Sequence, residues 1–338
     1  PWRSRSLAKH IMIGPLGFRA NAAGAPCRFP RRLSPAMFAS SHYSLRLVLY
    51  MATFIFSGMS ALVIIIEIKF LYPKSNHLLL SLFSTYAGSL LAGSCSKTMT
   101  RSNWITVMKL AVFEGVGNVL SRIGLLSTGG AQFAILSKSG TLFYGVFSRI
   151  VLPPARHPSS LQWCAISLIT GGLFLSTSGA VQTFTLSRLS GCVAVVVGFA
   201  AYGMGAVVGE LFMSVHEVVE PTQICWGEGV IGFIACAVWV ACTMRAAHLD
   251  SYGYLLCGCL TIVFAAHKGT WLALVGRVGA TASGVTQAMQ SVLLFFVSSA
   301  CFCSRDSAEC LTTAKFVSFV VVSSGVLIYS REEAARQR

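Results

Sequence analysis

The chain has 338 residues, of which 54% are hydrophobic and only 11% charged, with a formal net charge of +15. Soluble globular domains run near 25% charged residues, so this composition excludes a soluble enzyme or binding domain and indicates a polytopic membrane protein. The basic residues lie in termini and loops beside apolar segments, where they set membrane orientation, so no nucleic-acid partner is expected.

Residues 1–44 are rich in Arg and contain no acidic residue; the first acidic residue of the chain is Glu67. An acid-free, Arg-rich leader is typical of an organellar transit peptide. No clear amphipathic pattern accompanies it, however, and a disordered cytosolic tail, which we favour, explains the same composition. Whether residues 1–44 are a transit peptide stays open at this point.

Ten apolar segments follow, each close to the length of about 20 residues that a membrane-spanning helix needs. They cover residues 45–67, 78–95, 104–126, 131–152, 160–180, 188–213, 222–244, 252–276, 280–302 and 313–330. The segments predict an all-α integral membrane protein with ten transmembrane helices. With the N-terminus placed in the cytosol, 16 Lys or Arg, ten of them in the two terminal segments, lie on the cytosolic side and five on the far side, so both termini, including a tail at 331–338, are predicted to be cytosolic.

The second half of the chain echoes the first. The residues around Gly172 resemble those around Gly325, and about the same offset brings Ser139 close to Ser291. Because five spans is an odd number, a second copy of five must enter the membrane upside down. The sequence therefore predicts two inverted five-helix repeats, residues 45–180 and 188–330, with a solute site between them near the membrane midplane.

Polar and ionisable residues interrupt the third and fourth segments, where a charge costs roughly 3 kcal/mol on insertion scales. Glu114, Asn118 and Arg122 are spaced four apart and share one helix face. Lys138 and Thr141 belong to a similar stripe on the next segment. Two facing stripes predict a polar lining that contacts a substrate.

Lys138 itself has three interpretations. Its ammonium group suits a phosphate or carboxylate of the substrate, it can form a structural ion pair with Glu114, or it can snorkel towards the interface. Glu114 and Arg122 can likewise pair internally instead of contacting a solute.

The second half carries its own candidates. Glu228 and Lys268 are predicted at similar depths, which favours a buried ion pair and leaves proton or substrate coupling as the alternative. His267 is interpreted as a packing residue, with a proton relay as the alternative. Gln287 and Gln290 form an uncharged stripe that suits sugar hydroxyls or a base edge, or else hydrogen bonds between helices.

Two further features are assigned to packing and to the membrane interface. Gly198, Tyr202, Gly205 and Gly209 form a stripe of mostly small residues that predicts close helix packing. Glu210, at the cytosolic end of the same segment, is predicted to be interfacial.

No pattern of an enzyme, a metal site or a cofactor site is found. The sequence has no Walker glycine loop and no HExxH motif, and the C-x-C pairs lack the second pair that a zinc site needs. Cys303 and Cys310 flank a predicted loop, and whether they form a disulfide cannot be read from the sequence. Without an ATPase motif, transport has to be driven by gradients or exchange.

Several runs resemble a known family. They are K-L-A-V-F-E-G-V-G-N-V-L from Lys109, then G-L-L-S-T from Gly124, and Q-I-C-W-G-E-G-V-I-G from Gln223. In order, these runs resemble the drug/metabolite transporter superfamily and, within it, the nucleotide-sugar carriers of solute carrier family 35, F subgroup. The resemblance implies ten helices and alternating access without covalent chemistry. Where relatives carry Arg and Asp in span nine, this chain has Thr286 and Gln290, so the substrate is not carried over.

The leading hypothesis is a secondary transporter of a small anionic metabolite, such as a nucleotide sugar, in an intracellular membrane. The Golgi or the endosome and lysosome are favoured, with a mitochondrion or plastid as alternatives. A proton-coupled carrier of cations, amino acids or drug-like amines is a second hypothesis, and a non-transporting membrane interaction protein is a third. The expected partners are the solute and the lipid bilayer, with a homodimer left open and no cofactor.

Overall fold

In the computed structural model, the part of the chain that is described comprises residues 41–71, 77–94, 96, 99–128, 133, 136–137, 139–176, 186–216, 218–243, 250–305 and 310–337. These residues form helices and connecting turns, with no strand among them. The α-helices are α3 (Ser41–Leu71), α4 (His77–Gly93), α5 (Arg101–Thr128), α7 (Ser139–Val151), α8 (Ser160–Leu175), α9 (Leu186–Glu210), α10 (Pro221–Thr243), α11 (Ser251–Val278), α12 (Ala280–Phe302) and α13 (Thr313–Gln337). A short 3-10 turn, η1 (Pro154–Arg156), precedes α8, and a π-helical turn, η2 (Leu211–Val215), extends α9.

Six of the described helices are long and apolar enough to cross a membrane: α3, α9, α10, α11, α12 and α13. The outer surface agrees with a lipid environment, because large apolar side chains such as Phe56, Leu255 and Leu327 are 60–67% exposed. The chain is thus an all-α, multi-pass membrane protein. Each of the ten predicted segments overlaps one described helix, but that all ten cross the membrane stays a prediction.

The helix ends differ from the sequence-based bounds at α3, α7 and α13. α3 begins at Ser41, so residues 41–44 of the predicted disordered tail are helical, and residues 1–40 lie outside the described part. α7 begins at Ser139, whereas the fourth segment was predicted from residue 131; residues 129–132, 134–135 and 138 lie outside the described part. α13 runs on to Gln337, so residues 331–337 are helical rather than a separate tail. The reason is a set of polar contacts at the start of α8: Ser159 donates to Glu332 and Arg336 donates to Gln162.

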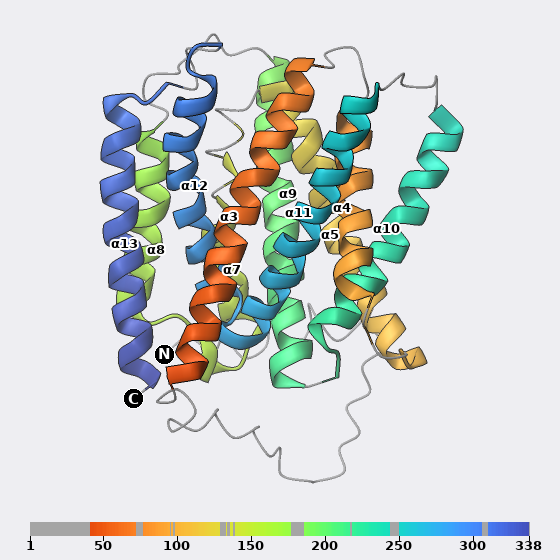
Figure 1. Ribbon diagram of the computed structural model, residues 1–338. Coiled ribbons are helices and arrows are strands. Elements are labelled where there is room, and N and C mark those ends of the chain that lie inside the picture. The colour runs from red at the N-terminus through yellow and green to blue at the C-terminus, as the bar shows by residue number, and fades with distance from the viewer. Residues whose placement is uncertain are drawn as a thin grey trace.

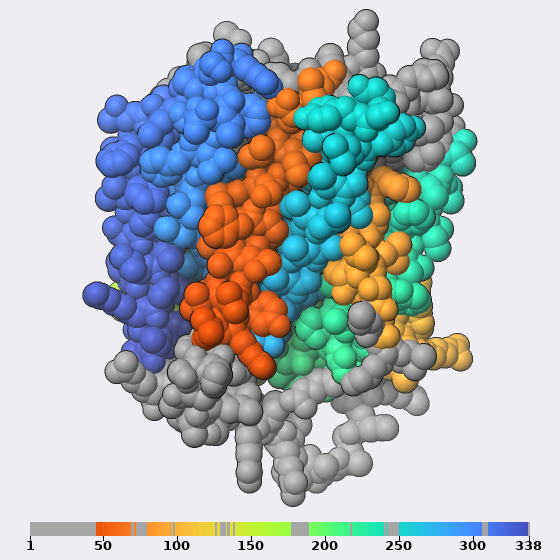
Figure 2. Space-filling model, in the orientation of Figure 1, coloured from red at the N-terminus to blue at the C-terminus, as the bar shows by residue number. Residues whose placement is uncertain are grey.

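The helices stand side by side, with the end of α13 and the start of α3 at the same face of the molecule (Figure 1). α13, α12, α3 and α11 form one continuous outer wall (Figure 2). The most extensive helix contacts come in matching pairs: α5 packs on α9 as α11 packs on α3, and α7 packs on α9 as α12 packs on α3. In addition α4 meets α10, α7 meets α12, and α8 meets α13.

The α8–α13 contact depends on two glycines. A Cβ atom on Gly172 would lie 2.8 Å from Val321 Cγ1 and 3.1 Å from Val322 Cγ2, and one on Gly325 would lie 2.7 Å from Ile169 Cγ1. These distances are too short for carbon atoms in contact, so only glycine lets the two backbones approach this closely. The residue offset that relates Gly172 to Gly325 also relates Ile169 to Val322, so the two contacts are equivalent.

Candidate functional site

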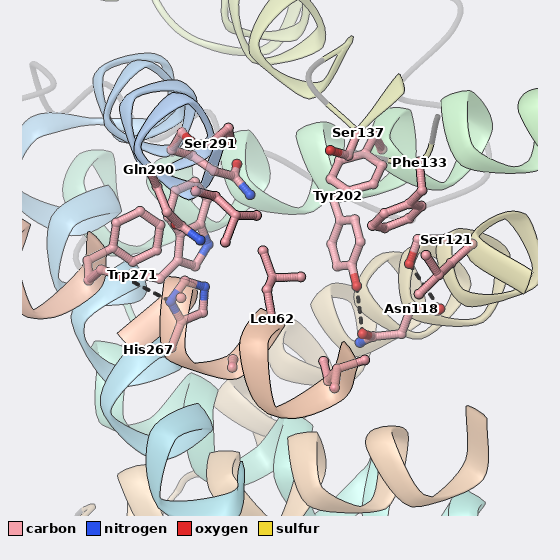
Figure 3. Close-up of a pocket in the computed structure, with 18 of the residues that line it drawn as sticks. Leu62, Asn118, Ser121, Phe133, Ser137, Tyr202, His267, Trp271, Gln290 and Ser291 are labelled. Carbon is pink, nitrogen blue, oxygen red and sulfur yellow. Dashed lines mark hydrogen bonds between the residues drawn. The ribbon is translucent and has the colours of Figure 1, made fainter. Parts of the chain in front are cut away.

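A cavity of about 840 Å³ lies among the helices, with walls from α3, α4, α5, α7, α9, α10, α11, α12 and the start of α13. This volume falls in the range of about 300–1,000 Å³ that is usual for small-molecule sites. Most of the wall is apolar, and a limited set of polar groups faces the space (Figure 3). Of the sequence-predicted site residues, Glu114, Asn118, Arg122, Glu228, His267, Lys268, Gln287 and Gln290 line it.

The main electrostatic feature of the cavity is a cluster of three charged residues, here called the Glu-Lys-Glu cluster, formed by Glu114, Lys268 and Glu228. Lys268 Nζ lies 2.6 Å from Glu114 Oε2 and 2.9 Å from Glu228 Oε2. The side chain of Glu114 is 19% exposed, that of Lys268 9% and that of Glu228 6%. All three charges are therefore largely shielded from bulk water. The cluster joins α5, α11 and α10 at one point.

The predicted pair of Glu228 and Lys268 is therefore confirmed, and the structure adds Glu114 as a second partner of the same lysine. Sequence reasoning missed this partner because helix periodicity fixes the face on which Glu114 lies but not the helix opposite. Lys138, the partner considered for Glu114, lies outside the described residues.

Arg122 lies two turns beyond Glu114 on the same face of α5 and lines the cavity. Among the described residues, no carboxylate lies within ion-pair distance of its guanidinium and no hydrogen bond ties it down. Its electrostatic neighbours are the phenols of Tyr86 and Tyr202. A guanidinium with five donors and no anionic partner is well suited to an anionic group of a bound molecule.

Asn118 is fixed by two tyrosines that sequence reasoning did not assign to the site. Tyr202 OH donates to Asn118 Oδ1 at 2.6 Å (Figure 3), and Asn118 Nδ2 donates to Tyr86 OH at 3.2 Å. Tyr202 had been interpreted as part of a packing stripe. Its neighbour Gly198 does pack closely on α5, but the phenol reaches the cavity, because one helix face serves both contacts.

An aromatic wall stands opposite, built on Phe54, His267, Trp271 and Tyr144. Phe54 stacks on His267 with ring centroids 4.5 Å apart and on Trp271 at 5.3 Å. His267 Nδ1 lies 3.2 Å from the carbonyl oxygen of Phe54. A carbonyl only accepts, so Nδ1 carries the proton in this contact, and the ring is held as a packing element of the wall.

The predicted stripe on α12 separates into two kinds of contact. Gln287 accepts a hydrogen bond from Tyr144 OH at 3.3 Å. Gln290 is 5% exposed, and its Oε1 has no hydrogen-bond partner among the described residues. Its amide packs into the space above Gly58, where no Cβ could fit. A buried amide oxygen without a donor costs about 1–3 kcal/mol, so this oxygen is available to a donor on a ligand.

Thr141 is not part of the cavity wall. Its hydroxyl donates to the carbonyl of Gly284 at 3.4 Å, which joins α7 to α12, and its side chain is 2% exposed. The prediction placed it on the stripe of Lys138; the structure turns this face of α7 towards α12 instead.

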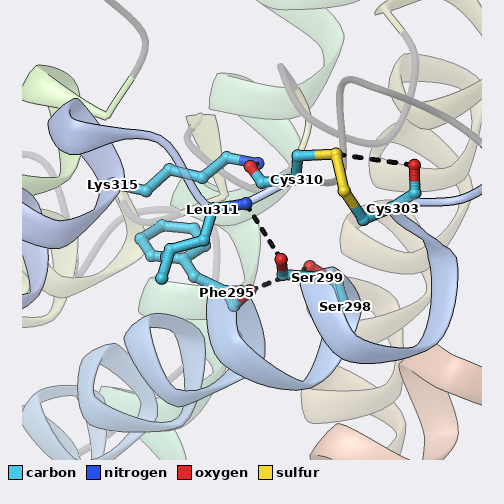
Figure 4. The surroundings of a disulfide bond; sticks show 7 residues. All are labelled: Phe295, Ser298, Ser299, Cys303, Cys310, Leu311 and Lys315. Atoms are coloured by element: carbon cyan, nitrogen blue, oxygen red, sulfur yellow. Dashed lines mark hydrogen bonds between the residues drawn. A yellow bond between two sulfur atoms is a disulfide. The ribbon is translucent and has the colours of Figure 1, made fainter.

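The cavity extends to the face opposite the start of α3 and the end of α13. Its wall includes Ser176 just after α8, Ser298 on α12, Thr312 just before α13, and Thr313 to Lys315 at the start of α13. The loop before α13 is closed by a disulfide between Cys303 and Cys310 (Figure 4). Lys315 Nζ donates to the carbonyl of Cys310 at 2.8 Å, so the closed loop positions this ammonium at the mouth.

The other end of the cavity is covered by a second polar group. Glu210 Oε2 accepts from the backbone N–H of Ala280 at 2.6 Å, and Oε1 accepts from Arg156 at 3.3 Å. Ser148 and Thr281 share a hydrogen bond of 2.9 Å nearby on α7 and α12. Glu210 is only 3% exposed, so its carboxylate is buried among the helix ends, while its position at the membrane interface stays a prediction. Its carboxylate satisfies the N-terminus of α12, a contact that no local pattern indicates.

The comparisons with known proteins concern the fold. The chain matches no protein-family model and no curated protein. In contrast, 29 chains of solved structures match it. One, described only as the crystal structure of a protein, superposes with a TM-score of 0.65 over 86% of this chain and 98% of its own length, at 13% sequence identity. At that identity the likeness shows a shared fold alone.

Proposed function

We propose that this protein is a secondary transporter that moves a small organic anion by alternating access. The observation that carries the proposal is the cavity of about 840 Å³ inside a multi-pass helical protein, open towards one face and lined by Arg122 and the unsatisfied amide oxygen of Gln290. A passive structural protein gains nothing from such groups, because each costs free energy unless a ligand satisfies it.

The helix contacts support ten spans in two inverted repeats. In chain order, the first five helices are α3, α4, α5, α7 and α8, and the second five are α9 to α13. When each helix is exchanged for the one at the same position in the other set, the α5–α9 contact becomes the α11–α3 contact, and the other extensive contacts also exchange in pairs or map onto themselves. The reciprocal glycine contacts of α8 and α13 obey the same relation. These two helices are antiparallel, since Ser159 at the start of α8 bonds Glu332 near the end of α13. An inverted repeat requires both features.

The charges of the cavity favour an anionic solute. Both carboxylates are engaged with Lys268, whereas Arg122 has no ion partner in the described part of the chain. Lys315 adds a positive charge at the mouth. An acidic group of the solute would therefore meet Arg122, and Gln290 would accept from a hydroxyl or N–H group. A nucleotide sugar or a phosphorylated metabolite has both kinds of group and fits the resemblance to solute carrier family 35.

The two ends of the cavity fit one state of an alternating-access cycle. The cavity reaches the face opposite the start of α3 and the end of α13, while the Arg156–Glu210 pair and the Ser148–Thr281 bond join the helices at the other face. With the termini in the cytosol, the open face is lumenal. The disulfide then lies on the lumenal side, where thiols oxidise, which favours a membrane of the secretory or endosomal system.

The proposal is tested by melting the purified protein in detergent with nucleotide sugars, sugar phosphates, amino acids and amines, followed by counterflow of any stabilising compound in proteoliposomes. A ligand at 100 times its Kd stabilises by about 2.7 kcal/mol. Arg122→Gln should abolish the shift and the counterflow. Arg305→Gln is the matched control, because that arginine pairs with Glu67 outside the cavity wall. If no anion gives a shift or saturable uptake, the proposal is wrong.

An amine carrier is the second candidate, since the Glu-Lys-Glu cluster has two carboxylates and one ammonium. In the same screen, this function predicts that amines stabilise the protein, that Glu228→Gln removes the effect and that Arg122→Gln does not.

A further inference from the structure

The Glu-Lys-Glu cluster contains two negatively charged groups and one positively charged group. Glu114 and Glu228 both lie within 3 Å of the single ammonium of Lys268, and all three side chains are largely shielded from water. With every group ionised, the cluster carries a net charge of −1 inside the membrane. An uncompensated buried charge costs several kcal/mol, so a positive charge has to accompany it or the carboxylates have to neutralise.

In the described part of the chain, Lys268 is the cation that lies within ion-pair distance of these carboxylates. The other titratable groups facing the cluster are the phenols of Tyr86, Tyr144 and Tyr202 and the thiol of Cys225, all neutral near pH 7. On α3 and α12, no titratable residue lines the cavity. His267, the neighbour of Lys268 in sequence, turns its Nδ1 to the carbonyl of Phe54.

Arg122 is the cation of α5 that lines the cavity. It lies two helical turns, or about 12 Å, from Glu114 along the axis. Its electrostatic neighbours are Tyr86 and Tyr202 rather than the carboxylates. Arg122 is also the group that the proposed solute occupies, so it does not balance the cluster during transport.

A second observation singles out Glu228. Its side chain is 6% exposed, less than the other two of the cluster, it lines the cavity, and Lys268 Nζ lies 2.9 Å from its Oε2. A carboxylate has about four lone-pair sites on its two oxygens, and a single ammonium shared with Glu114 does not fill them. Glu228 therefore keeps a position at which a proton can be added while Lys268 stays in contact.

We propose that the Glu-Lys-Glu cluster is a proton-binding site: one proton from the aqueous cavity adds to Glu228, or is shared with Glu114, while Lys268 stays charged. The net charge of the cluster then changes from −1 to 0 on binding and returns to −1 on release. Proton binding follows from the cluster alone. That the proton moves with the solute, and so couples transport to a pH gradient, rests on the proposed function.

The test is infrared difference spectroscopy of the full chain in liposomes, recorded while the pH is varied from about 9 to about 5, where exposed carboxylates stay ionised over most of the range. We expect the C=O band of one protonated carboxylic acid near neutral pH, in sodium and in choline buffer alike. Glu228→Gln and Glu114→Gln each leave one carboxylate for one ammonium, so either change should remove the band. Glu67→Gln, in the partly exposed pair with Arg305, is the matched control and should leave it unchanged.

Lys268→Met gives a result of opposite sign and does not depend on the glutamine variants folding well. Without the ammonium both carboxylates are unbalanced, so the band should grow to about twice its wild-type amplitude. A wild-type spectrum with no carboxylic acid band across this pH range overturns the proposal, and so does a band that sodium removes, because the bound cation is then sodium. An unchanged band in both glutamine variants overturns it as well.

The outcome is separable from that of the proposed function. A band that behaves as expected in a protein that moves no solute keeps the proton site and removes the transporter. Saturable anion uptake with no band, and with the same rate whether or not a pH gradient is imposed, keeps the transporter and removes the proton site.

Discussion

Replacing Lys268 by Met tests the electrostatic account of the cavity most directly. The substitution removes the only ammonium that contacts Glu114 and Glu228 in the described structure, at 2.6 and 2.9 Å. Removing one partner of a buried pair typically costs about 3–5 kcal/mol, because the remaining charge is left without compensation. We expect a loss of at least about 3 kcal/mol near neutral pH, with protonation of the carboxylates limiting the cost, since each proton taken up removes a charge.

The assay is equilibrium unfolding in mixed micelles, and two comparisons sharpen it. The triple variant Glu114→Gln, Lys268→Met, Glu228→Gln has no charge left to balance, so its stability should return to within about 1 kcal/mol of the wild type. Arg305→Met breaks a pair in which the arginine is 52% exposed, and should cost about 1 kcal/mol or less. The reasoning is refuted if Lys268→Met costs no more than Arg305→Met, or if the triple variant is as unstable as the single one.

Three further predictions concern packing and the mouth of the cavity. Gly172→Ala should lower the free energy of unfolding by about 1–3 kcal/mol in the same assay, because its Cβ would enter the α8–α13 contact. Gly171→Ala is the control: its Cβ meets open space, so it should be neutral or stabilise the protein by about 0.5–1 kcal/mol. Equal effects of the two substitutions would contradict the close approach of α8 and α13. Gly58→Ala should displace the flexible amide of Gln290 with little loss of stability, and it should weaken binding of the stabilising anion as strongly as Gln290→Leu does. If Gly58→Ala binds the anion as the wild type does, the amide of Gln290 does not contact the solute. Thiol labelling of the denatured, unreduced protein should leave Cys303 and Cys310 unmodified, and Cys303→Ser with Cys310→Ser should lose about 2 kcal/mol of stability; ready labelling of both would exclude the bond.

The candidate site was only partly readable from the sequence. The depth of Glu228 and Lys268 along their segments was enough to predict their ion pair, because two charges at one level of a membrane protein have few other partners. Glu114 could not be assigned in the same way, since its partner belongs to α11, more than 150 residues away. The burial of Glu210 could not be predicted, because its partner is the backbone N–H of Ala280 at the start of α12, and a residue sequence does not show where a backbone group will lie.

The sequence by itself determined that the chain is a helical, multi-pass membrane protein and that a polar face follows Glu114, Asn118 and Arg122. Both properties depend on local quantities, namely the length of apolar runs and the helical period. Tertiary structure alone decided which polar faces meet: that Thr141 turns to Gly284, that Tyr86 and Tyr202 hold Asn118, and that one lysine serves two glutamates. Helices in a membrane choose their neighbours by packing of small residues and by hydrogen bonds between segments distant in sequence, and periodicity carries no information about that choice.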